Sequence, residues 1–225
     1  MHSEPKMMPR GFHSDAIVRC VTLLPPRRAE HIMGMPAALR RWRRQEVLAL
    51  IDQTPLHSPR YELVDGELLV TPSSGGLHQI AVLALARALD DYCVSEGIGE
   101  TFVSPFDAEI ERGTLVQPDV FVVPPDEARR LRVERTARTL LLAAEIISPG
   151  SERGDRGQKR KLYQRHVPVY WIVDVEARVV ERWLPRTARP DLLREHLDWQ
   201  PAGARQPFRL ELHSYFARVY GEGLK

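Results

Sequence analysis

Two stretches of the chain are continuously apolar, the pattern of central strands that are covered on both faces. They are Leu115–Val123 and Thr139–Ser148, and each is interrupted by a single acidic residue. Thr101–Glu111 precedes them as another predicted strand. Val169–Val175 is a further apolar strand, which pairs through a short turn with Arg178–Leu184. These segments predict a central sheet.

Helical periods alternate with these strands. Gly76–Glu96 has its apolar residues at helical spacing and is followed by Gly97, which favours a helix end. Ser151–His166 is predicted to be a polar helix that follows a Ser148-Pro149-Gly150 turn. The apolar stripe predicted for the first of these helices consists of Ile80, Leu83, Ala84, Ala88 and Tyr92, widened by Leu85 and Leu89.

The remaining elements are shorter. Tyr61–Thr71 is predicted to form a hairpin because Asp65-Gly66 is a typical two-residue turn. Pro36–Ile51 has the pattern of a short amphipathic helix, and a last helix is predicted near Leu212–Tyr220, after one or two weak strands. The order of elements predicts a mixed α/β domain.

The ends of the chain and its composition indicate how many domains to expect and which classes of protein are disfavoured. Residues 1–34 are rich in proline and lack a pattern, so we expect a disordered extension there and a single domain over residues 35–225. A hydrophobic content of 43% is ordinary for a globular protein. Neither a membrane span nor a signal peptide is evident. The cysteines Cys20 and Cys93 match no metal or redox spacing, which favours a cytoplasmic location.

The two acidic residues within the apolar strands are the first candidates for chemistry. They are Asp119 and Glu145. A buried carboxylate without a partner costs several kcal/mol or more, and two that lie together need a shared cation or a raised pKa. Two other interpretations stay open: each acid pairs with its own arginine, or each lies at a strand end in solvent.

A lysine on the next helix supplies a matching positive charge. Asp155, Lys159 and Tyr163 recur every four residues and therefore share one helix face. Lysine is rare in this chain, whose other basic residues are nearly all arginine. The alternative is a solvated helix with an Asp155–Lys159 pair that contributes a few tenths of a kcal/mol.

Two carboxylates and a lysine suit the hydrolysis of phosphodiester bonds. A divalent cation such as Mg²⁺ or Mn²⁺ prefers oxygen ligands, lowers the pKa of bound water and offsets charge in the transition state. Lysine can orient the water or neutralise phosphate oxygens. The chain lacks the common nucleotide-binding, zinc-protease and serine-hydrolase motifs. A sugar-cleaving acid pair is disfavoured because aromatic residues make up only 7% of the chain.

Several blocks resemble the Uma-two family of restriction-endonuclease-like proteins, within the PD-(D/E)XK nuclease superfamily. In order, the blocks are YELVDGELLV (61–70), LHQIAVLALARAL (77–89), SPFDAEI (104–110), VQPDVFVV (116–123), AAEIISPGS (143–151), DRGQKRKLY (155–163) and VPVYWIVD (167–174). Together they span about Met35 to Leu184. The resemblance implies a restriction-endonuclease-like core, a mixed central sheet flanked by helices, with added C-terminal strands and a helix.

The resemblance also implies roles for particular residues. Pro118-Asp119 is the "PD" element and Glu145 the second acid, while the expected lysine position holds Ile147, so that Lys159 would supply the lysine from the helix. Further candidates in the matching blocks are Asp107 as a metal ligand and, in accessory roles, Glu62, His78, Asp155 and Tyr163.

The leading hypothesis is therefore a metal-dependent endonuclease that acts on DNA, and the resemblance implies a homodimer. The alternative is a non-catalytic nucleic-acid-binding or regulatory module on the same fold. The tail from Leu184 to Lys225 exceeds the minimal core and offers a dimer surface, unless its aromatic residues Trp199, Phe208, Tyr215 and Phe216 simply cap the sheet. A set of arginines near the candidate acids in the sequence is expected to line a nucleic-acid groove. They are Arg129, Arg130, Arg132, Arg135, Arg138, Arg153, Arg156, Arg160 and Arg165. The alternative is that these arginines form a solvated surface whose charge is balanced by acids.

Overall fold

The structure is a computed structural model that describes residues 40–54, 59–148 and 151–223. The extension expected over residues 1–34, the first residues of the helix expected from Pro36, and Pro149-Gly150 of the predicted turn lie outside the described residues. Residues Arg40–Lys225 form one compact unit by their internal contacts. No helix in the described ranges is long and apolar enough to cross a membrane.

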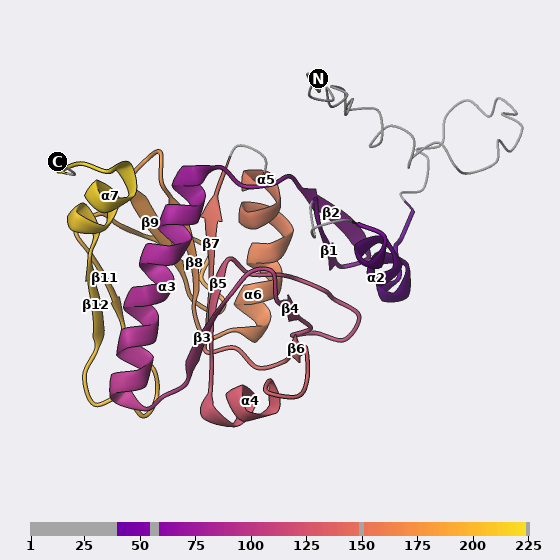
Figure 1. The fold of residues 1–225 in the computed structure, drawn as a ribbon, viewed down its shortest axis with the longest axis horizontal. Coiled ribbons are helices and arrows are strands. Elements are labelled where there is room, and N and C mark those ends of the chain that lie inside the picture. The colour runs from indigo at the N-terminus through magenta and orange to yellow at the C-terminus, as the bar shows by residue number, and fades with distance from the viewer. Residues whose placement is uncertain (1–39, 55–58, 149–150, 224–225) are drawn as a thin grey trace, which may run out of the picture. The chain divides into compact units, whose positions relative to one another are not determined.

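A six-stranded mixed sheet forms the centre of the fold, in the order β10-β9-β8-β7-β5-β3. Its strands are β3 (Glu100–Val103), β5 (Val120–Val123), β7 (Leu142–Ile147), β8 (Tyr170–Asp174), β9 (Val179–Trp183) and β10 (Asp191–Leu193). Only β7 and β8 run parallel; the other neighbours are antiparallel. Helix α3 (Gly76–Glu96) and helix α6 (Arg160–His166) lie on opposite sides of these strands (Figure 1).

The smaller elements surround this sheet. They are α2 (Arg44–Asp52), the hairpin β1 (Arg60–Val64) and β2 (Glu67–Thr71), the short pair β4 (Asp107–Ala108) and β6 (Thr136–Ala137), α4 (Pro125–Arg130), the hairpin β11 (His196–Trp199) and β12 (Phe208–Glu211), and α7 (Leu212–Tyr220). The predicted mixed α/β class, its flanking helices and the added C-terminal strands and helix are confirmed.

Turn chemistry fixes two of the predicted boundaries. Asp65 and Gly66 both have positive φ, 50° and 78°, as a two-residue hairpin turn of this kind requires. Gly97 ends α3 with φ 68°, a left-handed conformation that glycine adopts without steric cost. Both boundaries match the sequence prediction.

The apolar stripe predicted for α3 is partly wrong. Ile80 is 44% exposed and Leu83 is 65% exposed, whereas the helix buries Ala81, Ala84 and Leu85. Small alanine side chains let the helix backbone approach the sheet closely, so the buried face is rotated away from the larger residues. The buried face also contains Leu89 and Cys93.

Two apolar clusters cover the two sides of the sheet. On the α3 side, Trp171 packs against Trp199 and Phe208, with ring centroids 6.2 and 6.0 Å away, and α7 contributes Tyr215 and Phe216. All of these aromatic side chains are at least 90% buried. They therefore cap the sheet, which agrees with the alternative stated for these four residues.

Candidate active site

Asp119 and Glu145 lie near each other, on neighbouring segments of the chain. Asp119 comes directly before β5, whose first residue, Val120, pairs with Ala144 of β7 in antiparallel register. Glu145 is the next residue of β7, so the two acids are close neighbours at this end of the β5–β7 pair. Asp119 is 2% exposed and Glu145 is 1% exposed. The alternative that these acids lie at strand ends in solvent is therefore wrong.

Lys159 is the centre of a buried ionic cluster. Its Nζ lies 2.7 Å from Glu62 Oε2, 3.0 Å from Asp155 Oδ1 and 3.1 Å from Glu145 Oε1. Tyr163 also donates its hydroxyl hydrogen bond to Glu145 Oε1, at 3.1 Å. The structure thus brings together Lys159, Glu145 and three of the residues assigned accessory roles, Glu62, Asp155 and Tyr163.

A short π-helical segment helps to form this cluster. The helix predicted over Ser151–His166 consists of α5 (Glu152–Gly154), the π-helix η2 (Asp155–Lys159) and α6. Such bulges are frequent at functional sites. Asp155 and Lys159 begin and end the π segment, and both are buried, so the expectation that they share one helix face with Tyr163 agrees with the structure.

Asp119 belongs to an adjoining group with different partners. Its Oδ1 accepts a hydrogen bond from Arg60 Nη1 at 2.8 Å, and its Oδ2 lies 3.0 Å from His78 Nε2. The backbone N–H of Ile146 donates to the same Oδ2 at 2.9 Å. The pairing of Asp119 with an arginine agrees with one alternative left open by the sequence, although Glu145 has a lysine instead.

Burial and neighbouring charges move the pKa values of the two central acids in opposite directions. Burial would raise the pKa of Asp119, but the hydrogen bond with His78 and the charge of Arg60 outweigh it and hold that pKa well below its usual value. Burial raises the pKa of Glu145 well above the usual range, because Lys159 only partly compensates and Asp155, Asp119 and Glu62 repel its charge. Acid pairs with divergent pKa values are typical of catalytic sites.

The amino group of Lys159 stays charged in this environment. Burial favours the neutral amine, but the carboxylates of Asp155, Glu145 and Glu62 raise the pKa of Lys159 well above its ordinary value. One ammonium thus faces three carboxylates, and one oxygen of Asp155, Oδ2, is buried without a hydrogen-bond partner among the residues that the structure describes. The cluster therefore has more acidic groups than its lysine can neutralise.

Asp107 lies apart from these acids. Its half-buried carboxylate accepts a hydrogen bond from Gln117 Nε2 at 2.8 Å, and the backbone N–H of Gln117 donates to Glu62 Oε1, also at 2.8 Å. Gln117 thus connects Asp107 to the cluster, and no direct contact of Asp107 with Asp119 or Glu145 is recorded among the described residues. A direct metal-ligand role for Asp107 stays an untested prediction.

Two residues of the site, Arg60 and Gln117, were not among those predicted from the sequence. Arg60 lies two residues before Glu62 on β1, and alternate residues of a strand point to the same face. Gln117 comes directly before Pro118-Asp119. The alternation along β1 was therefore a usable signal for Arg60, whereas nothing in the sequence pattern singles out Gln117.

The cluster reaches the surface beside Asp119. A pocket of about 290 Å³ is lined by Asp119, Arg60, His78 and Ser104, together with Ser74 and Pro105 among others. Lys159 and Glu145 do not line this pocket. Asp119 and its partners therefore form the accessible edge of the site.

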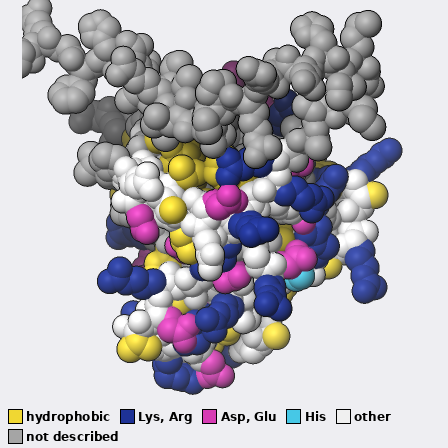
Figure 2. Space-filling model, turned by 90° about the vertical axis from the view of Figure 1, so that its right-hand side faces the viewer, with side chains coloured by type: hydrophobic (Ala, Val, Ile, Leu, Met, Phe, Trp, Pro, Cys, Tyr) yellow, Lys and Arg dark blue, Asp and Glu magenta, His cyan; other side chains and the backbone are white. Residues whose placement is uncertain are grey.

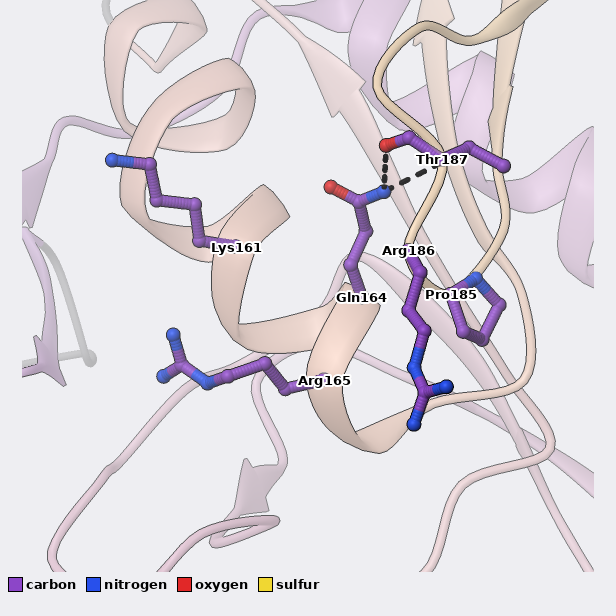
Figure 3. A pocket seen from close by; sticks show the side chains of 6 residues that line it. All are labelled: Lys161, Gln164, Arg165, Pro185, Arg186 and Thr187. Atoms are coloured by element: carbon purple, nitrogen blue, oxygen red, sulfur yellow. Dashed lines mark hydrogen bonds between the residues drawn. The ribbon is translucent and has the colours of Figure 1, made fainter.

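A larger groove, of about 830 Å³, lies on the outer side of α6 and shares no residue with the cluster. Figure 3 shows its lining side chains: Gln164 bonds Thr187, while the charged ends of Lys161, Arg165 and Arg186 point in different directions. Because these charges do not converge on one point, the groove is a weaker candidate for chemistry than the buried cluster.

Most of the arginines expected to line a nucleic-acid groove are paired with acids. Arg132 binds Glu100 and Arg165 binds Glu111. Further pairs are Arg129–Asp126, Arg130–Glu127, Arg138–Glu134 and Arg156–Glu181. On the face in Figure 2, basic and acidic side chains are interspersed over the part that is not grey. These contacts favour the alternative of a balanced, mixed surface.

The comparisons with known proteins agree with this architecture. A crystal structure of a protein described as a "putative nuclease belonging to DUF820", from Anabaena variabilis, has a TM-score of 0.65 and 16% sequence identity to this chain. The similarity covers 77% of this chain and 98% of that one, so it shows a shared fold. The search of curated proteins found no match. A model of the Uma2 family, described as "Putative restriction endonuclease", matches residues 44–204, more than half of the sequence, and the chain therefore belongs to this family.

Proposed function

We propose that this protein is a divalent-metal-dependent endonuclease that hydrolyses phosphodiester bonds of DNA, with Asp119, Glu145 and Lys159 as its catalytic residues. The observation that carries the proposal is the placement of two buried acids at the same end of the β5–β7 pair, with a buried lysine 3.1 Å from one of them. Membership of the Uma2 family supports nuclease activity as the class of reaction.

The types of ligand atom in the cluster suit a hard cation, whereas the side chains are not arranged around a single metal position. Carboxylate oxygens are the ligands that Mg²⁺ and Mn²⁺ prefer, and the excess of buried acids favours an added positive charge. However, no group of three or more His, Cys, Asp or Glu side chains surrounds one point within the described ranges. The carboxylates are instead turned toward Lys159 and Arg60. Asp119 and Glu145 would hold the ion after local side-chain rotation.

The roles of the chain's own residues follow from their contacts. A bound ion supplies an acidified water and neutralises phosphate charge. Glu62 and Asp155 hold the ammonium of Lys159 beside Glu145, where its positive charge would stabilise phosphate oxygens or orient the attacking water. His78 fixes Asp119 at the edge of the pocket, through which a phosphodiester group can approach.

A second candidate function is a non-catalytic nucleic-acid-binding or regulatory module. It is favoured by the saturation of Lys159, which contacts three carboxylates and is only 2% exposed. In this arrangement the ammonium does not reach the pocket surface. The two functions differ in whether divalent metal changes the protein and produces cleavage.

Cleavage of plasmid DNA tests the proposal. With Mg²⁺ or Mn²⁺, the wild-type protein is expected to nick or linearise supercoiled DNA, and excess chelator should stop it. Asp119→Asn is expected to reduce the rate by about 100-fold or more, because it weakens metal ligation and charge stabilisation. Glu127→Gln is a matched control, since Glu127 is also a buried acid but pairs with Arg130 on α4. Binding of DNA without any metal-dependent cleavage would support the non-catalytic module instead.

We also propose that the protein acts as a homodimer, because nucleases of this fold that cut both strands commonly pair two sites. The four aromatic side chains that cap the sheet do not supply the contact surface, because they are buried within the chain. Light scattering at tens of micromolar is expected to give twice the chain mass of 25.7 kDa. A monomer mass at that concentration would contradict the dimer without affecting the catalytic assignment.

A further inference from the structure

Arg60 occupies a position that is surrounded by oxygen atoms. A single nitrogen, Nη1, donates to Asp119 Oδ1 at 2.8 Å, Ser104 Oγ at 2.9 Å and the backbone carbonyl of Gln117 at 3.0 Å. The side chain is 11% exposed. A carboxylate, a hydroxyl and a carbonyl oxygen are also the groups that a hard divalent cation binds. The guanidinium thus occupies a site suited to a cation.

The side chain of Arg60 has room to move away from its acidic partner, whereas that of Lys159 does not. Lys159 is only 2% exposed and is surrounded by Glu62, Glu145 and Asp155. Arg60 lines the pocket of about 290 Å³ at the accessible edge of the site. Its guanidinium therefore has open space beside it into which it can rotate, whereas the ammonium of Lys159 has none at that pocket.

We propose that Arg60 is an internal counter-ion that neutralises Asp119 in the metal-free protein and withdraws into the adjoining pocket when a divalent metal binds. This inference rests on the proposed metal-dependent function. Arg60 competes with the metal for Asp119 Oδ1, so the protein binds metal more weakly than its acids alone would allow. The competition also keeps a buried carboxylate neutralised before substrate arrives, since an unpaired one is costly.

The withdrawn arginine would meet the substrate. A planar guanidinium binds phosphate through two parallel hydrogen bonds, and the pocket that receives it also borders Asp119. A DNA phosphate in the pocket would therefore hold Arg60 away from Asp119. Because such coupling is reciprocal, DNA should increase the affinity for metal in the wild-type protein, and metal should increase the affinity for DNA.

Calorimetric titration of the full chain with Mn²⁺ tests this role. Arg60→Gln is expected to bind Mn²⁺ about tenfold or more tightly than the wild type, because no guanidinium then competes with the ion for Asp119 Oδ1 or repels its charge. Arg129→Gln is the matched control, since it removes the same charge from an exposed pair with Asp126 on α4, and should bind Mn²⁺ as the wild type does. A short DNA duplex is expected to tighten Mn²⁺ binding in the wild type and to have less effect in Arg60→Gln.

The outcomes separate this inference from the function on which it rests. Equal or weaker Mn²⁺ binding by Arg60→Gln would overturn the counter-ion role and leave the metal site standing. Absence of Mn²⁺ binding in both proteins would overturn the metal-dependent function, and the inference with it. If Arg60→Gln does not fold without metal, circular dichroism should show that Mn²⁺ restores its folded state, because the ion replaces the lost charge. Failure of Mn²⁺ to do so would also count against the role of Arg60.

Discussion

Replacing Lys159 with methionine is expected to lower the free energy of unfolding by about 3–5 kcal/mol, the usual effect of removing one partner from a buried ionic group. The Nζ of Lys159 contacts Glu62, Asp155 and Glu145 within 3.1 Å, and all of these side chains are at most 2% exposed. Methionine fills a similar volume but supplies no charge, so three buried carboxylates lose their common partner. Cleavage of DNA should also be lost, measured below the melting temperature of the variant.

Denaturant unfolding of Lys159→Met beside Lys161→Met checks this expectation. Lys161 is an exposed lysine on the same helix, so its replacement should change stability by less than about 0.5 kcal/mol. The combination Lys159→Met with Glu145→Gln should recover part of the loss, because it leaves fewer unpaired charges. If Lys159→Met unfolds within about 1 kcal/mol of the wild type, the carboxylates are not held by this lysine, and the ionic cluster does not stabilise the fold.

The acids of the site were predictable because they are exceptions within strongly patterned segments. Asp119 and Glu145 stand out in apolar strands, and Lys159 stands out because lysine is rare in this chain. Their neighbours were harder to identify. Arg60 is one of many arginines: its alternation with Glu62 on β1 places it on the same face, but its role follows from its pairing with Asp119, 59 residues away. Contacts of such long range depend on how the hairpin meets the sheet, which local sequence does not determine.

For the arginines expected to line a nucleic-acid groove, the sequence already contained evidence against the prediction. Asp126 and Arg129 are three residues apart and Arg130 and Glu134 are four apart, spacings that favour ion pairs on a helix. The sequence therefore already contained the signal that these charges neutralise each other. The buried face of α3 was harder to predict from the sequence, because Ile80 and Leu83 are as apolar as the residues that the helix buries. Close packing on the sheet determines which face is buried.

Replacing Glu145 with glutamine is expected to have the opposite effect on the metal-free protein: it should stabilise the fold at neutral pH. Four buried acids, Asp119, Glu145, Glu62 and Asp155, share the positive charges of Lys159 and Arg60. Burial, together with the repulsion from the other acids, raises the pKa of Glu145 well above its ordinary value of 4.5. Glutamine preserves the shape and cannot ionise, so the fold neither has to take up a proton at this position nor bear a repelled charge there, while Lys159 keeps two carboxylate partners.

The sign of the pH dependence distinguishes this explanation from simple loss of a hydrogen bond. Because the folded protein holds the Glu145 proton more tightly than the unfolded chain does, this group stabilises the fold fully below the unfolded pKa of about 4.5. The stability is lost, by about 1.4 kcal/mol for each pH unit, as pH rises toward the folded pKa. Glu145→Gln lacks this loss, so its advantage over the wild type should grow as pH rises above 4.5.

Bound Mn²⁺ should make the wild type more stable than Glu145→Gln, the reverse of the order expected without metal. Mn²⁺ at a hundredfold excess over its dissociation constant would stabilise the wild type by about 2.7 kcal/mol, whereas Glu145→Gln has lost one of the proposed ligands and should respond much less. Unfolding curves at several pH values, with and without Mn²⁺, measure both effects. A variant that is less stable than the wild type at every pH, beside a wild type that does not respond to Mn²⁺, would make Glu145 a structural partner of Lys159. In that case the fold would carry the buried acids without using them for metal-dependent cleavage.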